Sequence, residues 1–479
     1  MDIPKILEKK LGRPVAVFGA GVSGNAVAEF LRGNGFSAKI YDRSAAGAAR
    51  LFGAAEAAEH DLVVFSPGFP REHPWKDAAR RAGLLCLCEP DFAALFWQGA
   101  LPPMKRLAGE SREEFLARAD ARLGLTAVTG TNGKTTLTEF LAFALRRVGR
   151  DSLAVGNNGV PMSRMLTHSS SASFRPVCEI SSFQAEELRY FSPRCVLWTN
   201  FDEDHLDRHG SEENYFRAKF RLVECMMRLR LVVGDFPQED DPNVRAVLAR
   251  RTLVVGESVA AAAARFGVAL PPWTQVATRA EVEGKIPPGS VFATFPQAEN
   301  YALARRFWLS CGFREKDLEA AALAFPAREH RLEKVRVLGG TGAPSVEFWD
   351  DSKGTNFHAA LAALETFPGK KIFWIGGGLG KGGDVAGFAK KVGAKIERAF
   401  LIGRTAEELR AAFAANGVPA ERFPQLPGAV AAAARAALAA GTDAAVLFSP
   451  GFASFDMFSG YAERGARFAQ CVNSLADVR

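Results

Sequence analysis

The sequence predicts an α/β protein made of three domains, each built around a parallel sheet with crossover helices. The first observation is that short apolar runs of strand length alternate with helical patterns along the whole chain. The second is that several of these runs end in a glycine-rich turn that leads directly into a helix. The length of 479 residues is too great for one ordinary domain and suits three.

Composition and charge restrict the classes of function. A hydrophobic content of 48% and a charged content of 24% are those of a globular protein that buries a core in each domain. No run of about 18 apolar residues occurs, so we expect no membrane insertion. The seven cysteines are scattered, which favours reduced thiols and a cytoplasmic location. The net charge of +7 comes without a long Lys/Arg block, which favours anionic small molecules over nucleic acid as partners.

The first domain, residues 1–100, has a nucleotide-binding pattern. A strand is expected over residues 14–18, followed by Gly19-Ala20-Gly21-Val22-Ser23-Gly24 and a helix. This order fits the G-x-G-x-x-G turn, and Asp42, after the next strand, lies near the place of a ribose-binding acid. A third strand runs into Ser66-Pro67-Gly68, at the strand end where open α/β sheets bind ligands. The pattern predicts a Rossmann-like domain with a dinucleotide or nucleotide site. The alternative is a set of tight turns that bind nothing.

A charged stretch that contains Pro102-Pro103 separates the first domain from the second. We interpret residues 101–122 as a linker that includes a helical segment from Arg112 to Arg122. The central domain then covers residues 123–327, and the third domain covers residues 328–479.

The central domain opens on the most informative stretch of the chain. Apolar residues lead into Gly130-Thr131-Asn132-Gly133-Lys134-Thr135-Thr136, and a helical pattern follows. Glycines let successive backbone N–H groups point at an anion, and the helix N-terminus adds its positive dipole end. Lys134 can reach the β- and γ-phosphates of a nucleoside triphosphate, and the Thr135 hydroxyl can bind Mg²⁺. The full P-loop pattern has a glycine where Val128 stands, so the alternative is an ordinary strand–turn–helix with a chance Gly-Lys-Thr.

Polar residues in and after the next strands are candidates for metal or substrate binding. Glu179 lies inside an apolar strand, where an unpaired charge is costly, so we expect a metal ion or another cation to hold it. The alternative is a buried structural salt bridge. The acids and histidines of residues 201–210 suggest a metal or substrate loop, although each taken singly is typical of a solvated charge. Lys219 follows Tyr215 by one helical turn, and its surroundings alone fit a snorkelling surface lysine.

The third domain repeats the strand-to-helix turn. Residues 325–333 have the pattern of a hinge into this domain. Asp350-Asp351-Ser352-Lys353-Gly354-Thr355-Asn356 follows a strand and caps a helix, and Gly376-Gly377-Gly378-Leu379-Gly380-Lys381 follows another strand. Both are candidate anion sites. The last strand leads into residues 449–458. Residues 257–297 have weak periodicity and indicate no chemistry.

Taken together, these motifs resemble those of the Mur ligases, and within that family those of the member that adds D-glutamate. The resemblance runs in order from residue 15 to residue 465, which is nearly the whole chain, and it explains the missing first glycine of the ATP loop. Where the family usually has Asn-Asp-Ser-Lys, this chain has Asp350-Asp351-Ser352-Lys353. The stretches that carry the resemblance are Gly130-Thr131-Asn132-Gly133-Lys134-Thr135, Glu179-Ile180-Ser181-Ser182-Phe183-Gln184, the run from Asp204 to Gly210, the run from Asp351 to Asn356, and the run from Ser449 to Asp456.

The resemblance implies roles for individual residues. Lys134 would act on the ATP phosphates, and Thr135, Glu179 and His205 would bind magnesium ions. Lys219 stands where the family carries a lysine carbamylated by CO₂, which would make it an anionic metal ligand and reverses the surface interpretation. The catalytic residues would therefore be Lys134, Lys219, His205 and Glu179. The resemblance assigns ATP binding to Gly130, Thr131, Asn132, Gly133, Lys134, Thr135, Thr136, Arg331, Asp351 and Lys353; UDP-substrate binding to Val22, Ser23, Asp42, Arg43, Ser66, Gly68 and Asn157; and D-glutamate binding to Lys381, Ser454 and Tyr461.

The implied enzyme is an ATP-dependent ligase that forms a C–N bond. It would join D-glutamate to UDP-N-acetylmuramoyl-L-alanine through an acyl phosphate in peptidoglycan precursor synthesis, with ATP and Mg²⁺ as cofactors and as a monomer. Three alternatives stay open at this point. They are another Mur-type ligase that adds a different amino acid, a nicotinamide-dependent oxidoreductase built on Gly19–Gly24, and a non-catalytic nucleotide switch.

Overall fold

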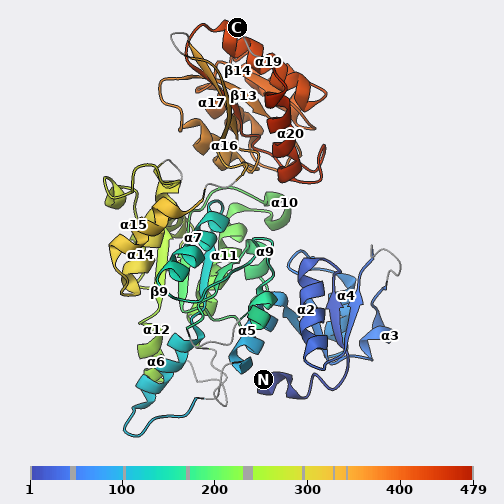
Figure 1. Cartoon of the computed structure of the whole chain (residues 1–479). Helices are drawn as coiled ribbons and strands as arrows, with labels where there is room; N and C mark the ends of the chain where they lie inside the picture. Colours follow the sequence, from blue (N-terminus) through green and yellow to red (C-terminus); the bar gives the residue numbers. More distant parts are fainter. Residues whose placement is uncertain are drawn as a thin grey trace. The chain divides into compact units, whose positions relative to one another are not determined.

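The strands form three separate sheets, and the central strands of each sheet are short runs of mostly buried residues (Figure 1). The computed structural model describes residues 3–43, 50–100, 104–168, 173–229, 241–293, 297–326, 329–340 and 344–476. Pro102-Pro103, the start of the predicted linker and the predicted boundary at 327–328 lie outside the described residues. The predicted division into domains therefore stays a prediction.

The first sheet is parallel and has the strand order β2-β1-β3-β4. Parallel neighbours need long crossovers, and helices supply them here. The expected glycine turn links β1 to α2, and α2 packs against β1 and β2. The strands are β1 (Val15–Phe18), β2 (Ala38–Tyr41), β3 (Leu62–Phe65) and β4 (Leu85–Cys88). The helices are α1 (Lys5–Glu8), α2 (Val22–Gly33), α3 (Ala54–Ala57), α4 (Pro74–Arg81) and α5 (Glu89–Ala100).

The second sheet is also parallel, with the order β10-β9-β8-β5-β7-β6. Because β5 lies between β7 and β8, the loops after these three strands meet at one edge of the sheet. The strands are β5 (Thr126–Thr129), β6 (Ala154–Gly156), β7 (Val177–Glu179), β8 (Cys195–Trp198), β9 (Thr252–Gly256) and β10 (Gln275–Ala277). The helices between α5 and β11 are α6 (Arg112–Leu123), α7 (Lys134–Arg147), η1 (Met162–Arg164), α8 (Met165–His168), α9 (Ser182–Ala185), α10 (Leu206–His209), α11 (Glu212–Met226), α12 (Pro242–Leu248), α13 (Glu257–Arg265), η2 (Ala280–Val282), α14 (Gln297–Ser310) and α15 (Glu315–Ala324).

The third sheet corrects the prediction of purely parallel sheets. Its order is β11-β12-β16-β13-β14-β15, and β11 runs antiparallel to β12. The short connection between these two strands can only reverse the chain, because a parallel return needs a crossover of a dozen or more residues. The strands are β11 (Glu333–Gly339), β12 (Ser345–Asp350), β13 (Lys371–Gly376), β14 (Arg398–Leu401), β15 (Ala420–Arg422) and β16 (Ala444–Phe448). The helices are α16 (Phe357–Leu364), α17 (Val385–Gly393), α18 (Ala406–Ala415), α19 (Leu426–Ala439) and α20 (Tyr461–Asn473).

Alternate residues of the central strands of this sheet enter two different cores. Val446 and Phe448 of β16 pack with residues of α19 and α20. Ala445 and Leu447 pack on the opposite face with residues of α16, α17 and α18. The two-residue repeat of a strand turns neighbouring side chains to opposite faces, so a strand covered by helices on both sides is apolar throughout. This is why β16 appears in the sequence as a continuous apolar run.

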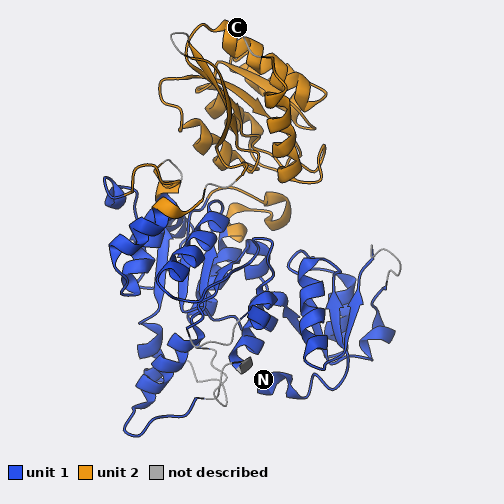
Figure 2. Cartoon of the chain, viewed as in Figure 1, with its two compact units in different colours: residues 1–201, 216–285, 299–322 blue, residues 202–215, 286–298, 323–479 orange. Residues whose placement is uncertain are grey.

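The chain divides into two compact units, which are described separately (Figure 2). Unit 1 comprises Met1–Phe201, Phe216–Lys285 and Glu299–Ala322, and it holds the first and second sheets. Unit 2 comprises Asp202–Tyr215, Ile286–Ala298 and Leu323–Arg479, and it holds the third sheet. In the part of the chain that the structure describes, no helix is long and apolar enough to cross a membrane.

Candidate active site

The loop after β5 has the backbone of an anion-binding turn. Gly130 has a φ of +143° and Gly133 has a φ of +79°, values that side-chain-bearing residues rarely adopt. A Cβ atom on Gly130 would lie 1.9 Å from Thr199 Oγ1, so no larger residue fits unless Thr199, the residue after β8, is displaced. Gly133 leads into α7, whose first residues are Lys134, Thr135 and Thr136. The predicted strand–glycine loop–helix is therefore present in unit 1.

Residues after β8 hold this loop in place, and sequence reasoning missed them. Asn132 N donates to Asn200 Oδ1 at 2.9 Å, and Thr131 N donates to Asn200 O at 3.1 Å. Thr199 Oγ1 donates to Asn132 O at 2.6 Å. Asn300 of α14 lies against Gly133, where a Cβ atom would meet its Oδ1 at 2.5 Å. The only sequence signal for Thr199 and Asn200 was their place at the end of a predicted strand. That this strand neighbours β5 is known from the structure.

Two lysines point at the same carbonyl of the loop. Lys134 Nζ donates to Gly130 O at 2.9 Å and to Thr131 O at 2.8 Å. Lys219 Nζ, from α11, donates to Gly130 O at 2.7 Å. Lys219 is only 1% exposed, so the alternative of a snorkelling surface lysine is wrong. The structure thus concentrates positive charge at the loop where phosphates are expected to bind.

Glu179 lies on β7 beside the strand that carries the loop. It pairs in register with Val128 of β5, and its side chain is 1% exposed. Asn157 Nδ2 donates to Glu179 Oε1 at 3.2 Å, while Glu179 Oε2 is buried without a hydrogen-bond partner. Among the described residues no ion pair to Glu179 is found, so the alternative of a buried structural salt bridge is not supported. An unpartnered buried carboxylate oxygen is a fitting ligand for a cation.

Most of the predicted UDP-substrate residues line one cavity of unit 1. The cavity has a volume of about 430 Å³ and lies between the turns of the first sheet and the loop after β6. The Ser66 hydroxyl in its lining is buried without a hydrogen-bond partner. Its lining includes Gly19, Gly21, Val22, Ser23, Ser66, Pro67, Gly68, Phe69, Pro70, Gly156, Asn157, Gly159, Pro161 and Gln184.

Two predicted UDP-substrate residues are not in this lining. Asp42 Oδ2 instead accepts a hydrogen bond from Ala20 N at 2.6 Å, so its carboxylate fixes the glycine turn that forms one wall of the cavity. The Arg43 guanidinium lies 5.7 Å from the centre of the Trp75 ring. The structure therefore gives Asp42 a supporting position and does not bring Arg43 to the cavity wall.

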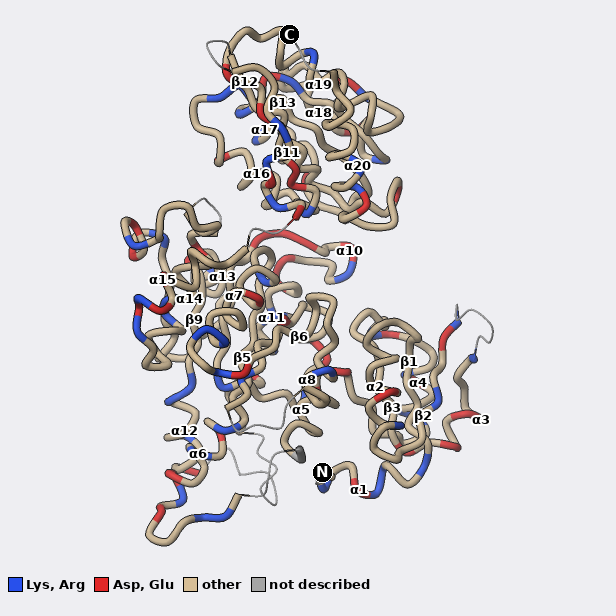
Figure 3. Tube along the Cα trace, in the orientation of Figure 1, with Lys and Arg blue, Asp and Glu red and all other residues tan. Residues whose placement is uncertain are grey.

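In unit 2, His205 and Lys381 line a second, small cavity of about 20 Å³. Asp204 joins the elements around it, because it lies 3.6 Å from Lys381 Nζ and accepts a hydrogen bond from Asn356 Nδ2 at 3.1 Å. His205 is one of three described non-glycine residues with a positive φ, at 54°. Figure 3 shows the acidic stretch that leads into α10 at this point. Sequence reasoning marked residues 201–210 as a binding loop but gave Asp204 no role of its own.

Three of the remaining predicted residues of unit 2, Asp351, Lys353 and Tyr461, lie around the end of β12. Burial raises the pKa of Asp351 to about 7, although Ser449 Oγ donates to its Oδ2 at 2.6 Å. Lys353 Nζ lies 3.8 Å from the centre of the Tyr461 ring, so a predicted nucleotide residue contacts a predicted D-glutamate residue. Ser454 is buried, and neither Ser454 nor Tyr461 lines the small cavity.

Arg464 of α20 is a further residue that sequence reasoning missed. Its guanidinium is 1% exposed and donates to Ser352 Oγ at 3.0 Å, to Ser352 O at 2.8 Å and to Phe452 O at 3.1 Å. Burial lowers its pKa to about 10. Arg464 thereby ties the turn after β12 to the turn after β16. No motif signals it, because an arginine on an amphipathic helix normally faces solvent.

Comparison with known proteins defines first a class and then a group within it. The model of the Mur ligase middle domain matches residues 128–264, and the model of the Mur ligase, glutamate ligase domain matches residues 330–452. The structure of UDP-N-acetylmuramate–alanine ligase from Thermotoga maritima has the same fold, with a TM-score of 0.53 at 18% identity over 96% of this chain and 99% of that chain. A pseudomurein peptide ligase type C from Methanothermus fervidus gives a TM-score of 0.53 at 13% identity over 97% and 100%.

The sequence relatives are more specific. A UDP-N-acetylmuramoylalanine–D-glutamate ligase from Geobacter metallireducens is 31% identical over 97% of this chain and 98% of its own length. One from Solibacter usitatus is 34% identical over 87% of this chain and 85% of its own length. The chain therefore belongs to the Mur ligase family, in the group of the UDP-N-acetylmuramoylalanine–D-glutamate ligases. The family and the fold class predicted from the sequence are both confirmed.

Proposed function

We propose that the chain joins D-glutamate to the L-alanyl carboxyl group of UDP-N-acetylmuramoyl-L-alanine at the expense of ATP. It is a ligase that forms a C–N bond in the synthesis of peptidoglycan precursors. The names of its relatives support this activity. The observation that carries it is the convergence of Lys134 and Lys219 on Gly130 O, beside the unpartnered oxygen of Glu179.

The reaction has two steps. The substrate carboxylate attacks the γ-phosphorus of ATP, which forms an acyl phosphate and releases ADP. The amine of D-glutamate then attacks the acyl carbon, the amide bond forms, and inorganic phosphate leaves. Carboxylate and triphosphate repel each other, so the first step needs cationic groups that hold both in line. Lys134, at the N-terminus of α7, would neutralise the phosphates, and the N–H groups of the glycine loop would add their dipoles.

The residues around the loop fit Mg²⁺. In unit 1, Thr135, Glu179 and a carbamylated Lys219 would hold it, and when bound it would neutralise charge between the phosphates and the substrate carboxylate. The role of His205 of unit 2 as a further magnesium ligand stays a prediction from the family resemblance. Carbamylation of Lys219 would replace one of two neighbouring ammonium groups by an anion. That change would relieve their repulsion and supply an oxygen ligand. Mg²⁺ binding and carbamylation both stay predictions.

The uridine diphosphate part of the substrate would occupy the cavity of unit 1. The turn before α2 places Val22 and Ser23 at a helix N-terminus, where backbone N–H groups and the helix dipole favour a diphosphate. Ser66 offers a hydroxyl without a partner, and Asn157 brings an amide from the loop after β6. Because Asn157 also binds Glu179, this loop links the substrate cavity to the ATP loop.

D-glutamate would bind in unit 2 at Lys381, with one carboxylate at the small cavity. Replacing Lys381 by alanine removes a charge-assisted hydrogen bond to that carboxylate, so we expect KM for D-glutamate to rise roughly 10- to 100-fold. KM for ATP should change little. The matched control is Lys395→Ala in the same unit. It removes an exposed ion pair in which Lys395 Nζ lies 2.6 Å from Glu365 Oε1. An unchanged KM for D-glutamate in Lys381→Ala would remove this residue from the proposed site.

The test of the function is phosphate release from ATP with UDP-N-acetylmuramoyl-L-alanine, with and without D-glutamate. Product formation that requires both, with a mass gain of one glutamate residue, is the expected result. Release with another amino acid would keep the mechanism and change the substrate. ATP binding without release under any pairing would favour the nucleotide switch, and binding of NAD in a fluorescence titration would favour the oxidoreductase. The monomeric state, the cytoplasmic location and the lack of nucleic-acid binding stay predictions.

A further inference from the structure

The turn that precedes β11 is held in an unfavourable backbone conformation. His330 has a φ of 61° and Leu332 has a φ of 47°, so both residues that flank Arg331 are left-handed. Side-chain-bearing residues rarely adopt this region, and a leucine does so less readily than an asparagine or a glycine. Such residues persist where surrounding contacts over-determine them, and they cluster at functional sites. Arg331 lies between them, and the resemblance to the Mur ligases predicts that it binds ATP.

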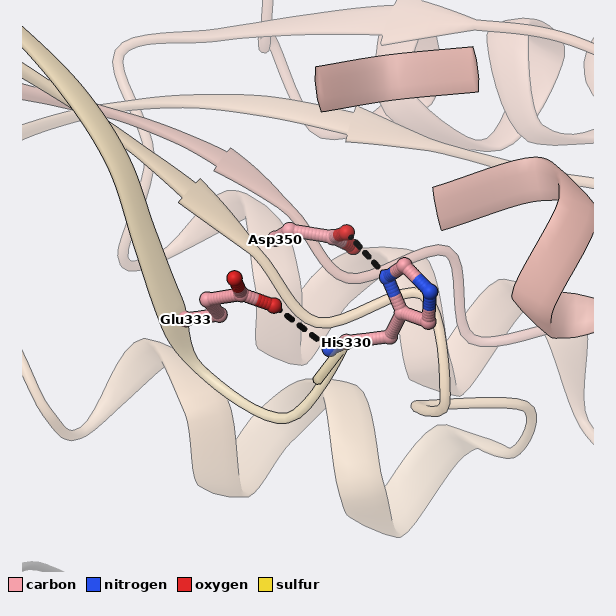
Figure 4. A group of neighbouring side chains, drawn as sticks. All are labelled: His330, Glu333 and Asp350. Atoms are coloured by element: carbon pink, nitrogen blue, oxygen red, sulfur yellow. Dashed lines mark hydrogen bonds and ion pairs between the residues drawn. The ribbon is translucent and has the colours of Figure 1, made fainter. Parts of the chain in front are cut away.

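Asp350 at the end of β12 holds the first of these residues (Figure 4). Its Oδ2 lies 2.7 Å from His330 Nδ1, and its Oδ1 accepts a hydrogen bond from Ser352 N at 2.8 Å. Glu333 Oε2 accepts the backbone N–H of His330 at 2.9 Å. Asp350 itself is 1% exposed, so it forms a fixed anchor inside the fold. The His330 side chain and backbone are therefore held by acids on two neighbouring strands.

Asp351, the next residue, holds the other side of the turn. The backbone N–H of Leu332 donates to its carboxylate, and the charge of Arg331 acts on the same group. The backbone N–H of Lys353 donates to His330 O at 3.1 Å. Two consecutive aspartates thus secure the two left-handed residues, and Arg331 is presented between them.

His330, Glu333 and Asp350 also have the composition of a metal site. Their polar atoms are already engaged with one another in hydrogen bonds (Figure 4). Gly465 of α20 packs against the same ring, because a Cβ atom on it would lie 2.2 Å from His330 Nδ1 and 2.8 Å from Asp350 Oδ2. The cluster is therefore a hydrogen-bonded support for the turn, and we assign no ion to it.

We propose that Asp350 is a positioning residue that fixes, through His330, the turn that presents Arg331 to the nucleotide. The proposal rests on the proposed function, since it takes Arg331 to bind ATP. The geometry also explains how Asp350 can stand where the family usually has asparagine. An asparagine would accept Ser352 N with its Oδ1 and donate from its Nδ2 to His330 Nδ1, provided that His330 carries its proton on Nε2. Either aspartate or asparagine can therefore connect His330 to Ser352 N, and alanine cannot.

The experiment measures ADP affinity by titration and KM for ATP by turnover in four variants. Asp350→Ala is expected to weaken ADP binding and raise KM for ATP about tenfold, with kcat at saturating ATP little changed. Asp350→Asn should stay close to the parent chain. His330→Asn keeps a residue that tolerates the left-handed conformation but does not reach Asp350, so it should behave like Asp350→Ala. Glu365→Gln, which breaks the exposed ion pair with Lys395, is the matched control.

Combining Asp350→Ala with Arg331→Ala identifies the route of the effect. If Asp350 acts through Arg331, the double variant binds ADP no more weakly than Arg331→Ala alone. Additive losses, or a normal ADP affinity in both Asp350→Ala and His330→Asn, would overturn the proposal. If Asp350→Ala does not fold, as judged by its thermal transition, His330→Asn carries the same test. ADP titration needs no ligase activity, so failure of the proposed reaction would be seen separately.

Discussion

Replacement of Lys134 by alanine is expected to lower kcat roughly a thousandfold or more and to leave affinity for the UDP-substrate unchanged. Lys134 is the first residue of α7, and its ammonium group donates hydrogen bonds to the carbonyl oxygens of Gly130 and Thr131. When a nucleoside triphosphate occupies the loop, this ammonium group would leave the carbonyl oxygens and bind the phosphates. The charge that develops during phosphoryl transfer would lose a preorganised partner. Initial rates at saturating ATP and calorimetric titration of the UDP-substrate measure the two quantities.

The control for this prediction is Arg147→Ala at the other end of the same helix. Arg147 is exposed and lies more than three turns away, so the change removes one positive charge from α7 without touching the loop. It should leave kcat within about twofold, as is usual for surface substitutions. Near-normal turnover in Lys134→Ala would reject the assignment of this loop as the phosphate cradle. A loss of UDP-substrate affinity in the same variant would mean that the loop and the cavity of unit 1 are not independent.

The strands that sequence reasoning located are those with a single strong signal. β1, β13 and β16 contain continuous apolar runs because helices cover both faces of their sheets, and each run ends at a glycine or serine turn. β5 is equally buried and leads into the glycine loop, although threonines stand at both of its ends. β11 was not predicted because its residues are partly exposed and alternate weakly. α20 packs against it, but most of its residues stay partly or fully exposed, so its sequence has no continuous apolar run.

The residues of the candidate site also fall into two groups, those that the sequence identified and those that it did not. Lys134 comes from a motif, Glu179 from a charge inside an apolar strand, and Lys219 only from the resemblance to the family, and the structure places all three around Gly130 and β5. Asn200, Asn300 and Arg464 could not be located, because each acts by a contact with a residue distant in sequence. A polar residue at the end of a strand has many possible partners, and only the strand order selects one. The order β8-β5-β7 is what brings Asn200 to the glycine loop.

The second large effect is expected from Glu179→Gln, which should make the metal-free protein more stable and the enzyme much less active. The carboxylate is buried, and one of its oxygens has no hydrogen-bond partner. An uncompensated buried charge costs more than a buried amide, so we expect the free energy of unfolding without Mg²⁺ to rise by about 1 kcal/mol or more. The same change removes an oxygen ligand, so the Mg²⁺ concentration for half-maximal rate should rise at least about tenfold. Thermal unfolding with and without Mg²⁺, and binding of Mn²⁺ as a spectroscopic probe, measure both effects.

Glu89→Gln is the matched control, because Glu89 is also buried and also has one oxygen without a partner. Its other oxygen accepts the backbone N–H of Ser163, and burial raises its pKa to about 7. Glu89 therefore already holds its proton for part of the time at neutral pH, which lowers the cost of its burial. Its replacement should stabilise the protein less than Glu179→Gln and leave the Mg²⁺ dependence unchanged. Equal Mg²⁺ dependence in both variants would mean that Glu179 holds no metal. The buried charge of Glu179 would then require another cation. Lys219, which shares Gly130 O with Lys134, would be the first candidate for that cation, and its substitution would be the next test.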